Sequence, residues 1–124
     1  MKILLIDDSK MVRTFTLKFL HSIGYTDIAI QEAENGVKGL GLFRSFQPDI
    51  LFLDLLMPEM TGTDFLNEIQ NDEHQCFVVV VSSNFQKPVQ DRVLNLGAHL
   101  FIEKPITIEK IQRIMTAYHA FKEK

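Results

Sequence analysis

The residues best placed to do chemistry are carboxylates that directly follow apolar runs. Asp7 and Asp8 follow the run Ile3–Ile6, and Asp54 follows the run Ile50–Leu53. Two adjacent carboxylates repel each other, and each raises the pKa of the other unless a cation lies between them. The acid pair is therefore either a solvated strand end or part of a site that binds something positive.

A hydroxyl and an ammonium occupy similar positions further along the chain. Ser82 follows the apolar run Phe77–Val81, and Lys104 comes directly after a run that ends at Glu103. If all these run ends meet, three carboxylates surround one point and form a hard-oxygen site. Such a site with few ligands suits Mg²⁺, which keeps several waters and accepts phosphate oxygens. The lysine and the serine would remain free to hold an anion.

The pattern between these residues alternates strands with amphipathic helices. Continuous apolar runs are typical of parallel strands that are covered on both faces, and parallel strands need crossover helices between them. Right-handed crossovers place the helices on both faces of the sheet, so we expect one doubly wound α/β sandwich. In such a sheet, ligands bind beyond the carboxyl ends of the strands. The expected strands are Lys2–Ile6, Ile28–Glu32, Ile50–Leu53, Phe77–Val81 and His99–Glu103.

Each candidate residue also has an ordinary reading when it is taken alone. Acids between a strand and a helix often only favour the helix dipole. Asp54 alone could be a turn residue, and neither Ser82-Ser83 nor Lys104-Pro105 alone indicates a function. Only their joint occurrence at one edge of one sheet predicts a site.

Length, charge and cysteine content set wider limits. The 124 residues suit one domain, 1–124, and the net charge of −3 gives no general reason to expect binding to nucleic acid or to an anionic membrane. The single cysteine, Cys76, adjoins an apolar run and is interpreted as a core residue. No apolar run approaches the ~20 residues of a membrane span. We therefore expect a soluble, cytoplasmic protein.

The constellation resembles the receiver domain of two-component response regulators, the CheY-like family, over essentially the whole chain. The resemblance rests on Asp7-Asp8 after an apolar strand, on Asp54 in LFLDLLMPEMTG, on Ser82 after FVVVV and on Lys104-Pro105 in FIEKP. It implies a flavodoxin-like (βα)5 sandwich with a five-stranded parallel sheet in the order 2-1-3-4-5.

The resemblance also implies a metal site. Asp54 would be the phosphoacceptor, whose carboxylate attacks phosphorus in line and forms an acyl phosphate. Asp8, Asp54 and the backbone carbonyl of Leu56 would hold Mg²⁺, and Asp7 would reach the metal through water. Bound Mg²⁺ would offset the repulsion within the acid pair.

The same resemblance assigns roles on the phosphoryl side. Lys104 would pair with one phosphoryl oxygen, and the Lys104-Pro105 peptide bond is expected to be cis. Ser82 would donate a hydrogen bond to another phosphoryl oxygen. In the family's switch, this hydroxyl moves toward the phosphoryl group and an aromatic residue of the fifth strand turns inward; the matching residue is Phe101. Ordinary packing is the alternative role for Phe101.

The expected function is a phosphorylation-dependent switch. The domain would take a phosphoryl group from the phosphohistidine of a sensor histidine kinase or a histidine phosphotransfer protein, and would then bind a downstream protein. It would catalyse only its own phosphorylation and dephosphorylation, so it would not be an enzyme in the usual sense. We expect no direct nucleic-acid or membrane binding, and a monomer or a phosphorylation-dependent dimer. The hypothetical docking face consists of Leu94, Phe101, Ile106, Lys110 and Arg113.

Two positions depart from the family pattern. Leu56 lies two residues after the phosphoacceptor, where many relatives have a polar side chain near the attacking water, and an apolar side chain cannot orient water. Asn84, two residues after Ser82, is neutral and can only form hydrogen bonds. This pair predicts slow self-dephosphorylation.

Three alternatives stay open. A phosphatase of the haloacid-dehalogenase type also uses an aspartyl nucleophile with Mg²⁺, but its motif needs a second acid two residues after the nucleophile and a cap domain for which this chain has no room. A pseudo-receiver would only bind partners, although the complete set of site residues argues against it. The chain could also be a receiver excised from a larger DNA-binding regulator.

Overall fold

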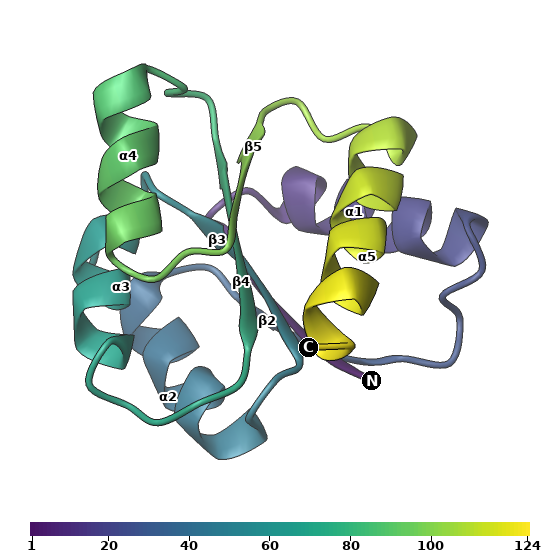
Figure 1. Ribbon diagram of the computed structural model, residues 1–124, viewed down its shortest axis with the longest axis horizontal. Helices are drawn as coiled ribbons and strands as arrows, with labels where there is room; N and C mark the ends of the chain where they lie inside the picture. Colours follow the sequence, from purple (N-terminus) through teal and green to yellow (C-terminus); the bar gives the residue numbers. More distant parts are fainter.

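A computed structural model describes all 124 residues, in which five strands alternate with five helices (Figure 1). The strands are β1 (Lys2–Ile6), β2 (Ala29–Ala33), β3 (Ile50–Asp54), β4 (Phe77–Ser82) and β5 (Leu100–Glu103). The helices are α1 (Lys10–Ser22), α2 (Gly36–Phe46), α3 (Gly62–Ile69), α4 (Lys87–Asn95) and α5 (Ile108–Lys122).

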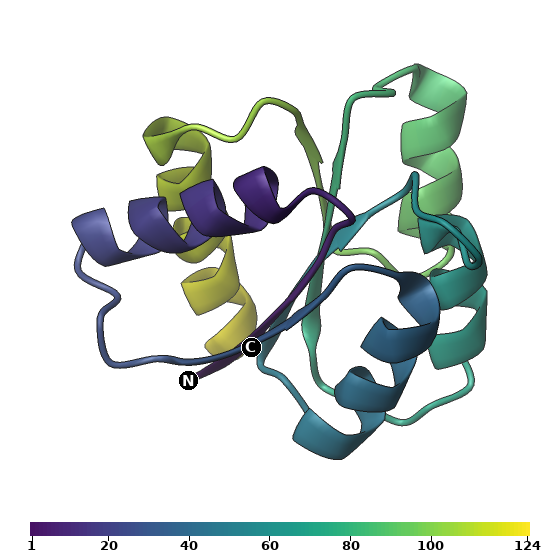
Figure 2. The same ribbon diagram turned by 180° about the vertical axis from the view of Figure 1, so that it is seen from behind.

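The strands form one parallel sheet in the order β2-β1-β3-β4-β5, as the resemblance implies. Helices α1 and α5 cover one face of the sheet, and α2, α3 and α4 cover the other, which is clearest when the views from the front and from behind are compared (Figures 1 and 2). The fold is therefore the expected doubly wound sandwich. Both chain termini lie near the end of the sheet where β1 begins (Figure 1).

Two apolar clusters fill the space on either side of the sheet. The cluster under α2, α3 and α4 contains Phe43 and Phe65, and the cluster under α1 and α5 contains Leu20 and Ile114. Strands β3 and β4 are buried along their whole length, whereas β2 at the edge is mostly exposed. This difference follows the sequence, because the inner strands are continuously apolar and β2 alternates.

The residues that cap α1 and α5 are of the types that favour helix starts, but the buried face of α1 differs from the one that the apolar spacing predicts. Ser9 and Thr107 cap α1 and α5 through their side-chain oxygens, the role that Ser and Thr favour before a helix. On α1, the spacing of apolar residues places Phe15 on the buried face, and this expectation is wrong because Phe15 is 43% exposed. Thr16 is buried in its place, which is tolerated because its hydroxyl donates a hydrogen bond to the Val12 carbonyl.

None of the five helices combines the length and the hydrophobicity that a membrane-spanning segment needs. The longest of them, α5, has 15 residues.

Candidate functional site

Strand register brings the candidate residues to one edge of the sheet. In β3 and β4, Asp54 lies opposite Val81, and in β4 and β5, Ser82 lies opposite Glu103. The backbone N–H of Lys104 then donates to the Ser82 carbonyl at 2.9 Å, which continues the ladder past the end of β5. The carboxyl ends of β1, β3, β4 and β5 therefore meet, at the edge from which the chain enters α4 and α5 (Figure 1).

Three carboxylates gather at this edge, and we call Asp7, Asp8 and Asp54 the acid cluster. One carboxylate oxygen from each lies within 4.8 Å of the others. Asp7 and Asp54 are both 5% exposed, while Asp8 is exposed. The backbone N–H of Ser9 donates to Asp7 at 2.9 Å, which fixes one of its oxygens. The sequence prediction that these acids converge is confirmed.

Lys104 is the one cation in contact with the acid cluster. Its ammonium lies 3.0 Å from Asp7 Oδ2 and 3.5 Å from Asp54 Oδ1, and its side chain is 17% exposed. Burial alone lowers the pKa of this ammonium, but the contacts with Asp7 and Asp54 outweigh burial, so its pKa is raised. Lys104 therefore stays charged, and three carboxylates share one positive group.

The surroundings of Asp54 make its carboxyl group a weaker acid than usual. Burial, followed by the charge of Asp7, raises the pKa of Asp54 from 3.8 to about 6, against the opposing effect of Lys104 and of the Leu56 N–H. An acid with a raised pKa beside other acids is a candidate for a functional group. A cation bound at the acid cluster would favour the ionised form of Asp54.

The donor set fits a divalent cation that prefers oxygen. Asp7 and Asp8 on one segment and Asp54 on another offer several carboxylate oxygens, and only one lysine opposes their charge. Mg²⁺ needs few protein oxygens because it retains waters. Asp7, Asp8 and Asp54 are the residues that would hold it, and a role for the Leu56 carbonyl stays a prediction.

Ser82 and the loop after β3 complete the site. Ser82 is 1% exposed, and its hydroxyl oxygen accepts a hydrogen bond from the Asn84 N–H at 3.0 Å, so the hydroxyl proton remains available for a ligand. After β3, the Leu56 side chain is 70% exposed, and the Leu56 N–H donates to Asp54 Oδ1 at 3.4 Å. The Lys104-Pro105 bond is cis, as the resemblance implies.

Gly62 is a supporting residue that the sequence reasoning missed. A Cβ atom at this position would lie 2.5 Å from the carbonyl oxygen of Asp54 and 2.8 Å from the Cα of Leu55. Gly62 also donates its N–H to the Leu55 carbonyl at 2.9 Å. Only glycine lets the start of α3 approach the backbone of Asp54 and Leu55 so closely. The sequence signal that could have identified it is a glycine eight residues after Asp54, where a helix is about to begin.

A mostly apolar groove of about 480 Å³ adjoins Lys104, between the start of α1 and the turn before α5. Met11 and Phe15 line it, and both side chains are exposed, by 65% and 43%. Leu56 and Phe85, also exposed, follow the ends of β3 and β4. Exposed apolar side chains therefore lie in the groove beside Lys104 and follow the ends of β3 and β4, and apolar patches of this kind are typical of contact surfaces.

The residues of the hypothetical docking face occupy varied environments. Leu94 is 44% exposed on α4, and Phe101 is half-buried against the cluster under α2, α3 and α4. Ile106 also lines the apolar groove beside α1, and Arg113 is exposed on α5. The Lys110 ammonium donates hydrogen bonds to two backbone carbonyls of the preceding turn. The switch role of Phe101 and the docking face stay predictions.

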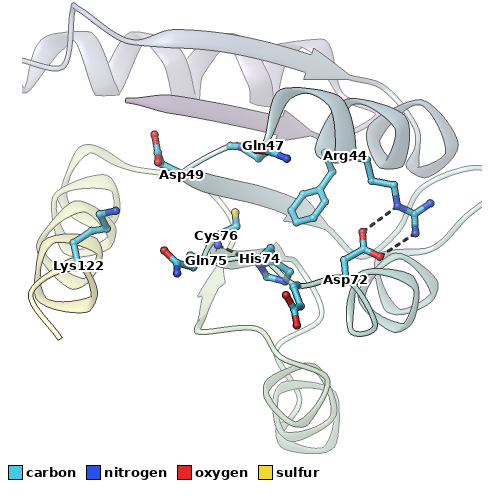
Figure 3. A pocket seen from close by; sticks show the side chains of 11 residues that line it. Arg44, Gln47, Asp49, Asp72, His74, Gln75, Cys76 and Lys122 are labelled. Carbon is cyan, nitrogen blue, oxygen red and sulfur yellow. Dashed lines mark hydrogen bonds and ion pairs between the residues drawn. The ribbon is translucent and has the colours of Figure 1, made fainter.

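A second hollow, of about 510 Å³, lies at the opposite end of the sheet (Figure 3). Arg44 pairs there with Asp72, and His74 Nδ1 accepts the Cys76 N–H at 3.1 Å. Burial raises the pKa of the Cys76 thiol, so it is not a reactive thiolate. Cys76 is a free, buried core residue, as interpreted from the sequence. Within this hollow, the pair Arg44–Asp72 and the His74 contact with the Cys76 N–H link polar groups to one another.

Comparison with known proteins agrees with this geometry. A family model described as "Response regulator receiver domain" matches residues 3–116. The protein named "Probable C4-dicarboxylate response regulator DctR" of Bacillus subtilis is 34% identical over 124 residues, covering 99% of this chain and 54% of DctR. The chemotaxis protein CheY of the same organism is 30% identical over 110 residues, covering 89% of this chain and 90% of CheY.

Solved structures agree as well. The crystal structure of a CheY-like response regulator receiver domain protein from Methanospirillum hungatei matches with a TM-score of 0.86 at 21% identity, over 98% of this chain and 96% of that chain. The chain belongs to the receiver-domain family of two-component response regulators. It spans about half the length of the DctR relatives.

Proposed function

We propose that this receiver domain accepts a phosphoryl group on Asp54 in a reaction that depends on Mg²⁺. The observation that carries the proposal is the acid cluster, in which two buried acids and one exposed acid lie within 4.8 Å beside a single partly exposed lysine. Such an excess of negative charge is costly without a bound cation. When bound, Mg²⁺ would neutralise this charge and that of an incoming phosphoryl oxygen.

The residues of the site have distinct tasks in the proposed reaction. An Asp54 oxygen attacks phosphorus, the bond between phosphorus and the donor nitrogen breaks, and its electron pair stays on the departing imidazole. Lys104, now paired with Asp7 and Asp54, would turn to a phosphoryl oxygen. The Ser82 hydroxyl, whose proton is free, would donate to a second oxygen. The chain would act only on its own aspartate, so it would not be a turnover enzyme.

The proposed donor is a sensor histidine kinase or a histidine phosphotransfer protein. Any protein that brings a phosphohistidine to Asp54 must cover the surface around the acid cluster. Met11 and Phe15 expose their side chains in the groove beside Lys104. Leu56, two residues after Asp54, is exposed as well. Burial of these apolar groups would stabilise the complex with the donor.

The proposed output is a change in protein binding. The domain would have two arrangements that differ in the packing of Phe101, and a hydrogen bond between Ser82 and the phosphoryl group would favour one of them. This change would alter the face that contains Leu94 and Arg113. The downstream partner would be another protein or an attached domain. The second possibility is open because DctR, at 54% coverage, is nearly twice as long as the matched segment.

The test is intact mass after incubation with Mg²⁺ and acetyl phosphate, with wild type beside Asp54→Asn. We expect one phosphoryl adduct in wild type, and no adduct in the variant or without metal. Asp72→Asn is a matched control, because Asp72 is an acid paired with Arg44 at the other end of the sheet. An adduct that persists in Asp54→Asn would contradict the proposal. Absence of both Mg²⁺ binding and adduct would support a pseudo-receiver that only binds partners.

A further inference from the structure

Lys110 sits where a helix normally disfavours a cation. It is the third residue of α5, and its own N–H donates to the capping oxygen of Thr107 at 3.2 Å. This position often carries Glu or Gln, which returns a hydrogen bond to the cap, whereas lysine has no acceptor atom. The positive end of the helix dipole also disfavours an ammonium in the first turn. Neither helix capping nor the helix dipole therefore accounts for a lysine at this position.

The Lys110 side chain turns back over the start of α5 and binds the preceding turn. Its ammonium donates to the Glu103 carbonyl at 2.6 Å and to the Pro105 carbonyl at 3.0 Å. Hydrogen bonds from a charged donor are stronger than those between neutral groups. One side chain thus links the end of β5, the turn and the first turn of α5.

The two carbonyls that Lys110 binds flank Lys104, whose ammonium reaches the acid cluster. On its other side, Lys104 is fixed by its N–H bond to the Ser82 carbonyl at 2.9 Å. The turn has few further backbone donors, because Pro105 has no N–H. Lys110 and Ser82 therefore hold the Lys104 backbone from two directions.

We propose that Lys110 is a positioning residue that aims the Lys104 ammonium at Asp7 and Asp54. The proposal rests on the proposed function, since Lys104 would be the group that contacts the phosphoryl oxygen. It also changes the interpretation of Lys110: with its ammonium bound by two carbonyls, this lysine serves the site and is not free to bind a partner protein.

The first test is independent of phosphorylation. The side-chain ammonium signal of Lys104 is recorded by nitrogen-correlated NMR in the full chain and assigned through its loss in Lys104→Met. We expect Lys110→Met to shift and broaden this signal, and Lys110→Arg to restore it, because arginine can bind both carbonyls. Lys122→Met is the matched control, because Lys122 is an exposed lysine on the same helix. An unchanged Lys104 signal in Lys110→Met would overturn the proposal.

The second test is a double-mutant cycle on the rate of phosphorylation by acetyl phosphate. We expect Lys110→Met to slow the reaction by about tenfold, within the ~10²-fold loss that a small misplacement can cause. In a Lys104→Met background, Lys110→Met should have no further effect, because Lys110 acts through Lys104. An equal loss in both backgrounds would assign Lys110 a merely structural role and contradict the proposal.

Two controls keep the outcomes separate. Urea unfolding shows whether each variant folds, and Lys110→Gln, which keeps a shorter neutral donor, replaces Lys110→Met in both tests if the latter does not fold. If wild type forms no adduct on Asp54, the proposed function fails, and the NMR comparison alone decides whether Lys110 positions Lys104. If wild type is phosphorylated and the Lys104 signal is insensitive to Lys110, only the inference about Lys110 fails.

Discussion

At the amino ends of the strands polar side chains are paired, whereas at the carboxyl ends three carboxylates share one ammonium. Around the hollow at the amino ends, Arg44 donates to Asp72, and His74 accepts the Cys76 N–H (Figure 3). His99, just before β5, accepts the Val78 N–H of β4. At the carboxyl ends, Lys104 alone faces the acid cluster.

The two ends therefore differ in how far their polar groups are paired. A buried polar group that is paired lowers the free energy of the fold or costs little, and an excess of buried like charge costs stability. The hollow at the amino ends is slightly larger than the groove beside Lys104, and its contact between Arg44 and Asp72 is an ion pair. The acid cluster retains an excess of negative charge, because Lys104 is the one cation in contact with it. In this protein, unbalanced charge indicates the site better than cavity size.

The largest expected effect comes from removing the cation at the carboxyl ends. Lys104→Met should slow phosphorylation by acetyl phosphate by about 10²-fold, because one donor to a developing negative charge is lost. Lys122→Met, at the edge of the hollow at the amino ends, should leave the rate unchanged. The rate of adduct formation by mass spectrometry checks both. Equal rates in the two variants would remove the functional distinction between the ends.

The next effect concerns stability in the absence of metal. Because the pKa of Asp54 is raised from 3.8 to about 6 in the folded protein, ionisation above pH 6 costs stability. Asp54→Asn should therefore raise the free energy of unfolding at pH 7 by about 1–2 kcal/mol, less than the ~3 kcal/mol of the full pKa difference because solvent screens the acids.

The pH dependence checks the sign of this effect. The gain in Asp54→Asn should shrink as the pH falls from 6, and it should vanish below 3.8, where Asp54 is protonated in both states. Asp72→Asn, which breaks an exposed ion pair, should change the unfolding free energy little. Urea titrations in EDTA give both values. A loss of stability in Asp54→Asn at pH 7 would show that the acid cluster is not strained.

A smaller effect sharpens the description of the carboxyl ends. The 70% exposed Leu56 cannot orient an attacking water, so the isolated phosphoprotein should lose its phosphoryl group slowly. Leu56→Asn should speed this loss by about fivefold, which corresponds to the ~1 kcal/mol of one net hydrogen bond. Leu94→Asn is the control at another exposed leucine. Release of inorganic phosphate measures the rate, and fast loss in wild type would contradict the prediction.

The smallest effect tests the amino ends. Burial lowers the pKa of His99, and the charge of His74 adds to this, so the folded state favours neutral imidazole. The unfolded chain then binds the proton more readily, and stability falls as the pH drops below 6.5. His99→Gln keeps an acceptor for the Val78 N–H. It should reduce the fall in the free energy of unfolding between pH 7 and pH 5 by less than ~1 kcal/mol. His21→Gln, at an exposed site, should match wild type; equal pH profiles in all three would contradict the prediction.

Much of the fold and of the site could be predicted from local patterns. Strands and helices lie where apolar runs and caps indicate, although several bounds differ by a residue or two; β5, for example, begins at Leu100 and not at His99. The convergence of Asp7, Asp54 and Lys104 followed from their places after apolar runs, because parallel strands end at one edge. The exposure of Phe15 could not be predicted, since helical spacing does not say how far a helix face is covered.

The sequence by itself determined the alternation of strands and helices and the residues that end each strand, because these depend on apolar periodicity and on neighbouring residues. Only the tertiary structure decided that the Lys104 ammonium lies closer to Asp7 than to Asp54, that Gly62 packs against the Asp54 backbone, and that Lys110 binds the turn beside Lys104. Each of these contacts joins segments whose separation is set by strand register and by the path of a turn. Packing of the whole chain fixes that geometry, and no local pattern encodes it.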